Sequence, residues 1–299
     1  MPDQSLLATS DLHVTHGGNR EVIESIHPYS PEDWLIVAGD VGDTIADVHW
    51  VLGLLRERFA KVIWAPGNHE LWTSPRDPVQ ARGVERYERL IELARSLDVV
   101  TPEDPYPVWQ GEQERFAIVP LFLLYDYSFR PRGLSLDQAM ALAHQARVVA
   151  TDEYLLHCDP YPTRQEWCHA RIRTTLDRLE QLPTGMRTVL VSHWPLHRGP
   201  TTMLRYPLFA MWCGTQLTGD WHLRFRAAVA VYGHLHIPLT LTFDGVRFEE
   251  VSLGYPREWR KRSPEPPYPV RRILPADPER HTMNRLLMRA AGAQRRVRA

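Results

Sequence analysis

Short apolar runs, each followed by a polar turn that contains glycine, recur along this chain and limit what it can fold into. Near the start of the chain the runs are 6–8, 34–38 and 62–64, which are too short for helices. Between them lie two segments, 19–26 and 45–60, that have the pattern of helices. This β-α-β-α-β order favours a parallel sheet with right-handed crossovers, in which functional loops leave the carboxyl ends of the strands.

Two long segments of different composition interrupt this pattern. The first contains a charged helix, expected over 79–96, and then a proline-rich stretch. A strand is expected over 116–124. The second segment, 125–182, is polar and mostly helical, with arginines in its loops. Because it stands between core strands, we expect it to form a cap over the site.

The strand pattern returns at 188–192 and 227–232, and a hairpin follows. Its Asp244-Gly245 pair is a strong signal for a type I′ turn. From 255 onward the chain is rich in proline and arginine, and we expect irregular structure laid over the domain surface.

The whole chain is expected to form one domain, with no internal repeat. The last residues are expected to be a short basic helix or disordered. The expected parts are the core (1–72, 115–124 and 186–254), the insertions (73–114 and 125–185), the C-terminal extension (255–299) and, within it, the basic end (285–299).

Composition excludes several classes of partner. The formal net charge is -1, which argues against a groove for duplex nucleic acid and against an anionic membrane as partner. The first residues lack the basic and apolar regions of a signal peptide, and no run of about 18 apolar residues indicates a transmembrane helix. We therefore expect a cytoplasmic protein. Its cysteines, which lack CxxC spacing and are expected as reduced thiols, are Cys158, Cys168 and Cys213.

Five clusters of metal-ligand side chains stand at the ends of the expected strands. Carboxylate, imidazole and one carboxamide oxygen suit Fe, Mn, Zn or Ni better than Mg or Ca, which prefer oxygen ligands. A lone histidine after a strand is more often structural, but five clusters in order indicate a metal site. The clusters are Asp11-Leu-His13, Gly39-Asp40-Val-Gly-Asp43, Gly67-Asn68-His69-Glu70, Ser192-His193-Trp-Pro195 and Gly233-His234-Leu-His236.

These clusters resemble the motifs of the calcineurin-like metallophosphoesterase superfamily, which are DxH, GDxxD, GNH(D/E), H and GHxH. The resemblance runs from Asp11 to His236 and every motif is intact. It implies an α/β protein, a four-layer α/β/β/α sandwich of two mixed sheets with flanking helices, here with an inserted helical cap. It also implies a hydrolase that cleaves a phosphomonoester or phosphodiester with a bridging hydroxide on a binuclear metal centre.

The resemblance also assigns metal ligands to positions of this sequence. The cofactors implied are two divalent or trivalent transition-metal ions: Mn, Fe, Zn or Ni. The i, i+2 spacing within the first and last motifs fits this assignment, since alternate side chains of an extended loop point to the same side. The implied ligands are Asp11, His13 and His236 for one ion, Asn68, His193 and His234 for the other, and Asp40 as the bridge.

The resemblance identifies His69 as the general acid, because this residue adjoins the ligand Asn68 and is not itself a ligand in the family. Asp43 would hydrogen-bond His69, fix its tautomer and raise its pKa. An alternative role for Asp43 is the N-cap of the following helix. For Glu70, helix capping and support of the ligand loops are equally consistent with the sequence.

Four residues outside the motifs are candidates for substrate binding. Solvated loops or buried aromatic residues would explain the same positions. The substrate is expected to be a small phosphorylated molecule, with a nucleotide as one option, and the alternative function is that of a nuclease or nucleotide phosphodiesterase. A non-catalytic metal-binding scaffold should have lost a ligand or His69, and none is lost. The four candidates are Tyr125, Arg130, His197 and Arg198.

Overall fold

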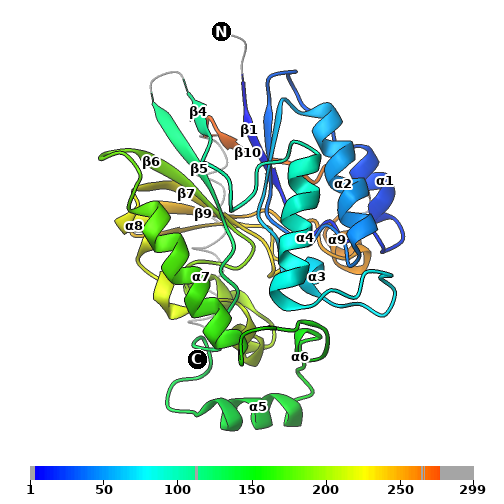
Figure 1. The fold of residues 1–299 in the computed structure, drawn as a ribbon, viewed down its shortest axis with the longest axis vertical. Coiled ribbons are helices and arrows are strands. Elements are labelled where there is room, and N and C mark those ends of the chain that lie inside the picture. Colours follow the sequence, from blue (N-terminus) through cyan, green and yellow to red (C-terminus); the bar gives the residue numbers. More distant parts are fainter. Residues whose placement is uncertain (1–3, 112–113, 264, 266, 277–299) are drawn as a thin grey trace.

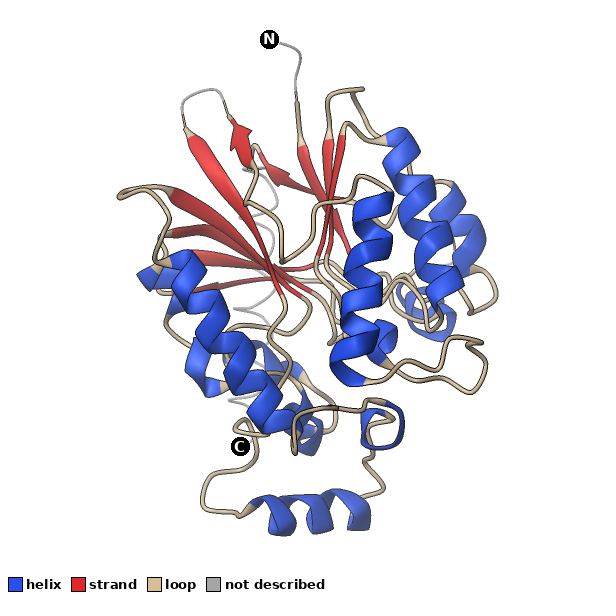
Figure 2. Ribbon diagram, viewed as in Figure 1, coloured by secondary structure: helices blue, strands red, loops and turns tan. Residues whose placement is uncertain are grey.

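The computed structural model describes residues 4–111, 114–263, 265 and 267–276, so the basic end expected over 285–299 lies outside it. The described residues form two mixed β-sheets with helices on both outer sides (Figure 2). The first sheet has the order β10-β1-β2-β3, in which β1, β2 and β3 are parallel and β10 is an antiparallel edge. Its strands are β1 (Leu6–Thr9), β2 (Trp34–Val37), β3 (Lys61–Trp64) and β10 (Arg271–Leu274).

The second sheet has the order β4-β5-β6-β7-β9-β8, with four parallel strands between two antiparallel edges. Asp244 and Gly245 have φ of 51° and 80°, which confirms the left-handed hairpin turn between β8 and β9. The strands are β4 (Val108–Gln110), β5 (Arg115–Leu121), β6 (Arg187–Ser192), β7 (Ala227–Tyr232), β8 (Thr240–Phe243) and β9 (Val246–Glu250).

A layer of buried apolar side chains joins the two sheets. Leu6 and Ala8 of β1 point into this layer, whereas Leu7, between them, points to the helices, as the alternation of a strand requires. From the second sheet, Val189 and Val229 enter the same layer. The four-layer sandwich expected from the sequence is confirmed.

Helices on the outer side of the first sheet follow directly from sequence signals. In α2 the side chain of Thr44 caps the first turn, and Val48 to Leu55 supply the buried stripe. The charged helix α4 begins at Gly83 rather than at residue 79, because the side chain of Asp77 accepts a hydrogen bond from the Val79 N–H and holds a turn there. The helices are α1 (Asn19–Glu24), α2 (Ile45–Arg58), α3 (Asn68–Leu71), α4 (Gly83–Ser96) and α9 (Pro256–Arg262).

Helices on the other side include most of the expected cap, but not as one body. Trp167 and Ile172 of α7 are buried in the main core, so α7 covers the second sheet rather than the site (Figure 1). Helices α5 and α6 lie below it, beyond the ends of the strands. The elements are α5 (Leu136–Gln145), α6 (Asp152–Leu155), α7 (Arg164–Leu179), α8 (Trp221–Arg224) and the 3₁₀ turns η1 (Gly199–Met203), η2 (Pro207–Trp212) and η3 (Gln216–Thr218).

The expectation of irregular structure after residue 254 is wrong for α9 and β10. Trp259 of α9 is buried, and its indole N–H donates to Asn19 Oδ1 at 2.9 Å. Strand β10 pairs with β1 and buries Ile273 and Leu274. Both elements are short and surrounded by proline and arginine, so their order depends on partners far away in sequence.

The two sheets meet where their parallel strands end. Ser10, just after β1, forms a bridge with Ser252, just after β9, and its N–H donates to Val251 O at 3.1 Å. This seam joins the carboxyl ends of both sheets, where α/β folds place their sites. No helix of the described ranges is long and apolar enough to cross a membrane.

Candidate metal centre

The loops at this seam hold most of the predicted ligands in left-handed backbone conformations. Such conformations cost free energy in non-glycine residues, so they persist only where the surrounding structure fixes them. The i, i+2 pairs therefore reach one cavity through two left-handed residues each, not through the extended loop that the spacing suggested. The φ values are 53° for Asp11, 41° for His13, 55° for Asp40, 69° for His234 and 54° for His236.

One group of donors comes from the first and last motifs. His236 Nε2 lies 3.0 Å from Asp11 Oδ1 and 3.1 Å from His13 Nε2. Asp11 and His13 are fully buried. Two ring nitrogens and a carboxylate oxygen converging in this way form a set that a transition-metal ion prefers.

A second group comes from three other strand ends. His193 Nε2 lies 3.0 Å from Asn68 Oδ1 and 3.1 Å from His234 Nδ1, and His234 Nδ1 lies 3.1 Å from Asn68 Oδ1. The opposite nitrogen of His193, Nδ1, lies 2.8 Å from the carbonyl oxygen of Ala38. This contact makes Nδ1 the protonated nitrogen and leaves the Nε2 lone pair facing the other two donors.

Asp40 lies between the two groups. Its Oδ2 is 3.3 Å from His193 Nε2 and 3.9 Å from His13 Nε2. One carboxylate therefore faces both sets of donors. The structure brings together all seven residues predicted as ligands, in the two groups that the resemblance implied.

Glycines of the motifs make room for the two carboxylates. A Cβ on Gly67 would lie 2.1 Å from Asp40 Oδ1, and a Cβ on Gly233 would lie 2.2 Å from Asp11 Oδ2. The N–H groups that follow use this space: His69 N donates to Asp40 and His234 N donates to Asp11. The donor set and its glycine cradles fit a pair of transition-metal ions.

Glu70 fixes the loop that carries Asp40. Its carboxylate accepts hydrogen bonds from the N–H groups of Asp40, Val41 and Gly67, at 3.0, 2.8 and 2.9 Å. Both roles weighed for Glu70 are therefore present, the cap of α3 and the support of a ligand loop. Burial, and then the charge of Asp40, raise its pKa to about 7.

Two further carboxylates hold side chains that are predicted as ligands, and sequence reasoning missed both. Glu258 Oε2 of α9 lies 2.6 Å from His236 Nδ1. Asp152 Oδ1 of α6 accepts a hydrogen bond from Asn68 Nδ2 at 2.9 Å. Such partners orient ligands and set their basicity. Neither residue adjoins a motif, so no local signal could have identified them.

The ligand imidazoles differ strongly in proton affinity. Burial opposes the charged form of His236, but Asp11 and Glu258 raise its pKa to about 10. Burial likewise opposes His193, while Asp40 raises its pKa to about 9. Burial and the neighbouring His193 lower the pKa of His234 to about 3. Metal binding must displace the protons of the first two histidines, so it should release protons.

His69 lies beside the predicted ligands, but its ring hydrogen-bonds to Asp43. Its Nδ1 lies 2.8 Å from Asp43 Oδ1, and its ring packs on Trp72. The N-cap of α2 is Thr44, so the carboxylate of Asp43 is available to His69. Burial disfavours the charged form of His69, but Asp40 and Asp43 raise its pKa. Donor atoms of His13, Asp43 and His69 also lie within 4.8 Å of one another, which leaves metal binding as a competing role.

The four substrate-binding candidates do not line the cavity at the ligands. Tyr125 is fully buried. Arg130 Nε donates to Leu134 O at 2.9 Å, and His197 Nδ1 accepts from Gly199 N at 3.0 Å. Arg198 Nη2 reaches Arg130 O at 3.4 Å. Arg130 and His197 are thus engaged within their own loops, Tyr125 in the core, and Arg198 with the neighbouring loop of Arg130.

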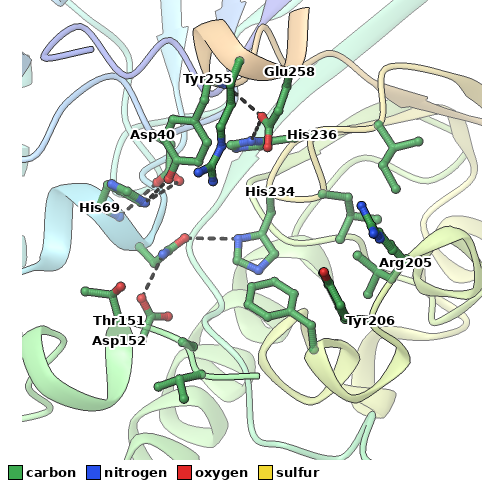
Figure 3. A pocket seen from close by; sticks show the side chains of 18 of the residues that line it. Asp40, His69, Thr151, Asp152, Arg205, Tyr206, His234, His236, Tyr255 and Glu258 are labelled. Carbon is green, nitrogen blue, oxygen red and sulfur yellow. Dashed lines mark hydrogen bonds and ion pairs between the residues drawn. The ribbon is translucent and has the colours of Figure 1, made fainter. Parts of the chain in front are cut away.

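A cavity of about 860 Å³ opens over the ligands, with His69 and Asp152 facing Arg205 and Tyr206 across it (Figure 3). Its floor is polar and its wall is largely apolar, with basic side chains at the rim. The wall includes Val149, Leu204, Tyr206, Phe209 and Ile237, and the basic side chains are Arg205, Arg257, Lys261 and Arg262.

Comparisons with known proteins identify the family to which the chain belongs. The model of the calcineurin-like phosphoesterase family matches residues 5–238. The acyl-carrier-protein phosphodiesterase PptH of Mycobacterium tuberculosis is 56% identical over 279 residues, which are 93% of this chain and 85% of the relative. The crystal structure of phosphopantetheinyl hydrolase PptH from that organism superposes with a TM-score of 0.89 at 56% identity, covering 92% of this chain and 97% of that one.

Proposed function

This chain belongs to the calcineurin-like phosphoesterase family and is a hydrolase, and we propose that it cleaves the phosphodiester that joins a phosphopantetheine arm to a carrier protein. The observation that supports the chemistry is the convergence of two donor groups on Asp40. The observation that supports the substrate is the similarity to PptH over almost the whole chain. A nucleotide substrate, open on sequence alone, has no such support.

The seven converging side chains would hold two ions, with Asp40 between them and the other six divided three and three. The ions would supply an activated water and would neutralise the negative charge of the phosphoryl group. The chain's own contribution is orientation: Glu258 and Asp152 fix the donors of His236 and Asn68, and Glu70 fixes the loop of Asp40.

The leaving group of this reaction is a serine oxygen of the carrier protein, which is a poor leaving group without a proton. His69 would supply it, because its Nδ1 is held by Asp43 and its ring lines the cavity. In the balanced step, the oxygen of water bonds to phosphorus and the water loses one proton to the solvent, while the bond from phosphorus to the serine oxygen breaks and a proton passes from His69 to that oxygen. His69 then takes up a proton from the solvent. The products are phosphopantetheine and the unmodified carrier protein.

Tyr255 is a further candidate for contact with the phosphodiester. Its ring stacks on His13 with centroids 4.5 Å apart, and its hydroxyl lies 3.5 Å from His69 Nε2. The hydroxyl and the imidazole would therefore face the same oxygen of the substrate. Tyr255→Phe keeps the stacking and removes the hydroxyl, so metal content should be retained while kcat falls.

The apolar wall is suited to the remainder of the substrate. Phe209 lies parallel to the ring of His234, and Val149 and Tyr206 are 46% and 56% exposed at the cavity. A phosphate alone would not fill about 860 Å³, whereas a long arm with hydrocarbon segments would cover such a wall.

The direct test uses an acyl carrier protein that bears the phosphopantetheine arm. After incubation with the metal-loaded enzyme, intact-mass spectrometry should record conversion to the unmodified carrier, with free phosphopantetheine in solution. The chelated enzyme and the Asp40→Asn variant serve as controls. If the enzyme hydrolyses an aryl phosphodiester but leaves the carrier intact, the substrate is wrong; if it hydrolyses neither, the catalytic proposal fails.

A further inference from the structure

Helix α9 presents two different faces at the cavity. Its Glu258 points to His236 and its Trp259 is buried beneath the helix. Arg257 and Lys261, four residues apart and therefore on one face, are exposed and line the cavity. The only acidic residue of α9 is thus engaged at the metal-ligand cluster, and the outward face of the helix is positive.

Several cations elsewhere on the surface are paired with acids, although some, such as Arg115, are not paired within the described ranges. On the helical layer of the first sheet, Arg56 pairs with Asp98 at 2.5 Å, and Arg95 pairs with Asp104 at 2.7 Å. At the cavity the pattern differs. Within the part of the chain that the structure describes, no carboxylate lies within 4.0 Å of the nitrogens of Arg205, Arg257 or Lys261.

These three residues, Arg205, Arg257 and Lys261, are called the basic rim. They come from two segments of the chain. Arg205 lies just before η2, and Arg257 and Lys261 lie on α9. Arg205 and Tyr206 lie across the opening from His69 (Figure 3). The chain as a whole has a net charge of -1, so the local excess of positive charge at the basic rim does not follow from the composition. Unpaired cations on two sides of an opening focus the field on what enters it.

We propose that the basic rim docks an acidic surface of the carrier protein, so that the arm enters the cavity and its phosphodiester reaches His69. This inference rests on the proposed function. The depth of the site favours it, because Asp40 and His69 at the floor are 2% and 7% exposed and only an extended arm brings a protein-linked phosphate to them. Arg262, the fourth basic side chain at the cavity, is held by the carbonyl oxygens of His236 and Leu253. The other three are too few and too local for a groove that tracks a nucleic acid backbone.

The test is the double variant Arg257→Glu/Lys261→Glu, with Arg115→Glu as the matched control. Arg115 is exposed, lies at the start of β5 and has no acidic partner among the described residues. Values of kcat/KM are measured on the arm-bearing carrier and on an aryl phosphodiester, at low and high salt. Melting temperature and metal content confirm that each variant is folded and loaded.

On the carrier, the double variant should lose roughly tenfold to a hundredfold in kcat/KM at low salt, mainly through KM, because attraction becomes repulsion at two rim positions. High salt should reduce the difference from wild type. The loss on the aryl phosphodiester should be much smaller, and Arg115→Glu should resemble wild type on both substrates. A carrier whose acidic residues beside the modified serine are changed to lysine should restore turnover by the double variant.

Equal losses on both substrates, or no loss on the carrier, would overturn the docking proposal while the proposed function stands. Wild-type enzyme without turnover of the carrier would instead overturn the proposed function. Unmodified carrier protein should inhibit wild type more strongly than the double variant. If RNA or vesicles of anionic lipid compete with the carrier at the rim more strongly than unmodified carrier does, the rim serves those partners and the proposal is wrong.

Discussion

The strand-end loops of the core and the two peripheral segments, α6 and α9, meet at one site but contribute different parts of it. The loops supply every predicted ligand, mostly from left-handed residues with glycine neighbours. The peripheral segments supply Asp152 and Glu258, which hold Asn68 and His236, and α9 also places Arg257 and Lys261 at the cavity. Under the proposed function, the core would carry the chemistry and the periphery would orient the ligands and select the substrate.

This division has a physical origin. A ligand must sit within bonding distance of an ion, and in this fold the rigid strand ends hold the predicted donors that closely. A residue that orients a ligand needs only one hydrogen bond, so it can come from any segment that packs nearby. The following predictions test whether the two regions differ in effect as they do in structure.

The largest effect is expected at the centre of the core. Asp40→Asn removes the one carboxylate that faces both donor groups, so both ions should bind weakly and hydrolysis should fall to background. Elemental analysis after metal reconstitution, with kcat/KM on an aryl phosphodiester, measures this. A variant with two bound equivalents and normal turnover would show that Asp40 is not the bridge.

The next effect isolates proton donation within the core. His69→Ala should retain both ions but lose roughly 10²–10⁴-fold in kcat/KM, the usual range for general acid catalysis. The loss should be large on the carrier serine ester and small for a nitrophenolate leaving group, which departs without a proton. If the dependence on leaving-group pKa is the same as in wild type, His69 is not the acid; loss of metal would place it among the ligands.

The periphery should give smaller and more local losses. Glu258→Gln should weaken the ion held by His236, and Asp152→Asn the ion held by Asn68, each by roughly 10–100-fold in affinity or activity. Titration with each metal, followed by elemental analysis, separates the two ions. If either variant loses metal binding and activity as completely as Asp40→Asn, the core and the periphery do not differ in effect.

The smallest effect concerns pH. A general acid is active below its pKa. Burial lowers the pKa of His69, but Asp40 and Asp43 outweigh this effect and raise it. Asp43→Asn should lower it, so the alkaline limb of kcat/KM should move to lower pH. Asp47→Asn, which disturbs the cap of α2 without touching His69, is the control and should leave the limb in place. If the alkaline limb stays in place in Asp43→Asn, Asp43 does not set the pKa of the general acid His69.

Much of the fold was predictable because its signals are local. The early β-α-β-α-β unit, the Asp244-Gly245 turn and the helix after Thr44 each depend on a few adjacent residues. The start of α4 was not predictable, because a turn held by the side chain of Asp77 decides where the helix begins. The ordered segment around Trp259 was not predictable either, because it depends on the contact of Trp259 with the distant Asn19.

For the site, the sequence alone determined the kinds of donor, their order along the chain and their position at strand ends. Intact motifs were sufficient for this, since the chemistry of a ligand belongs to its side chain. The tertiary structure decided which donors converge and that Glu258 and Asp152 hold two of them. It also decided that Arg257 and Lys261 lie at the opening without an acidic partner among the described residues, while Arg130 does not reach it. These facts depend on contacts between segments far apart in sequence, and no local pattern encodes such contacts.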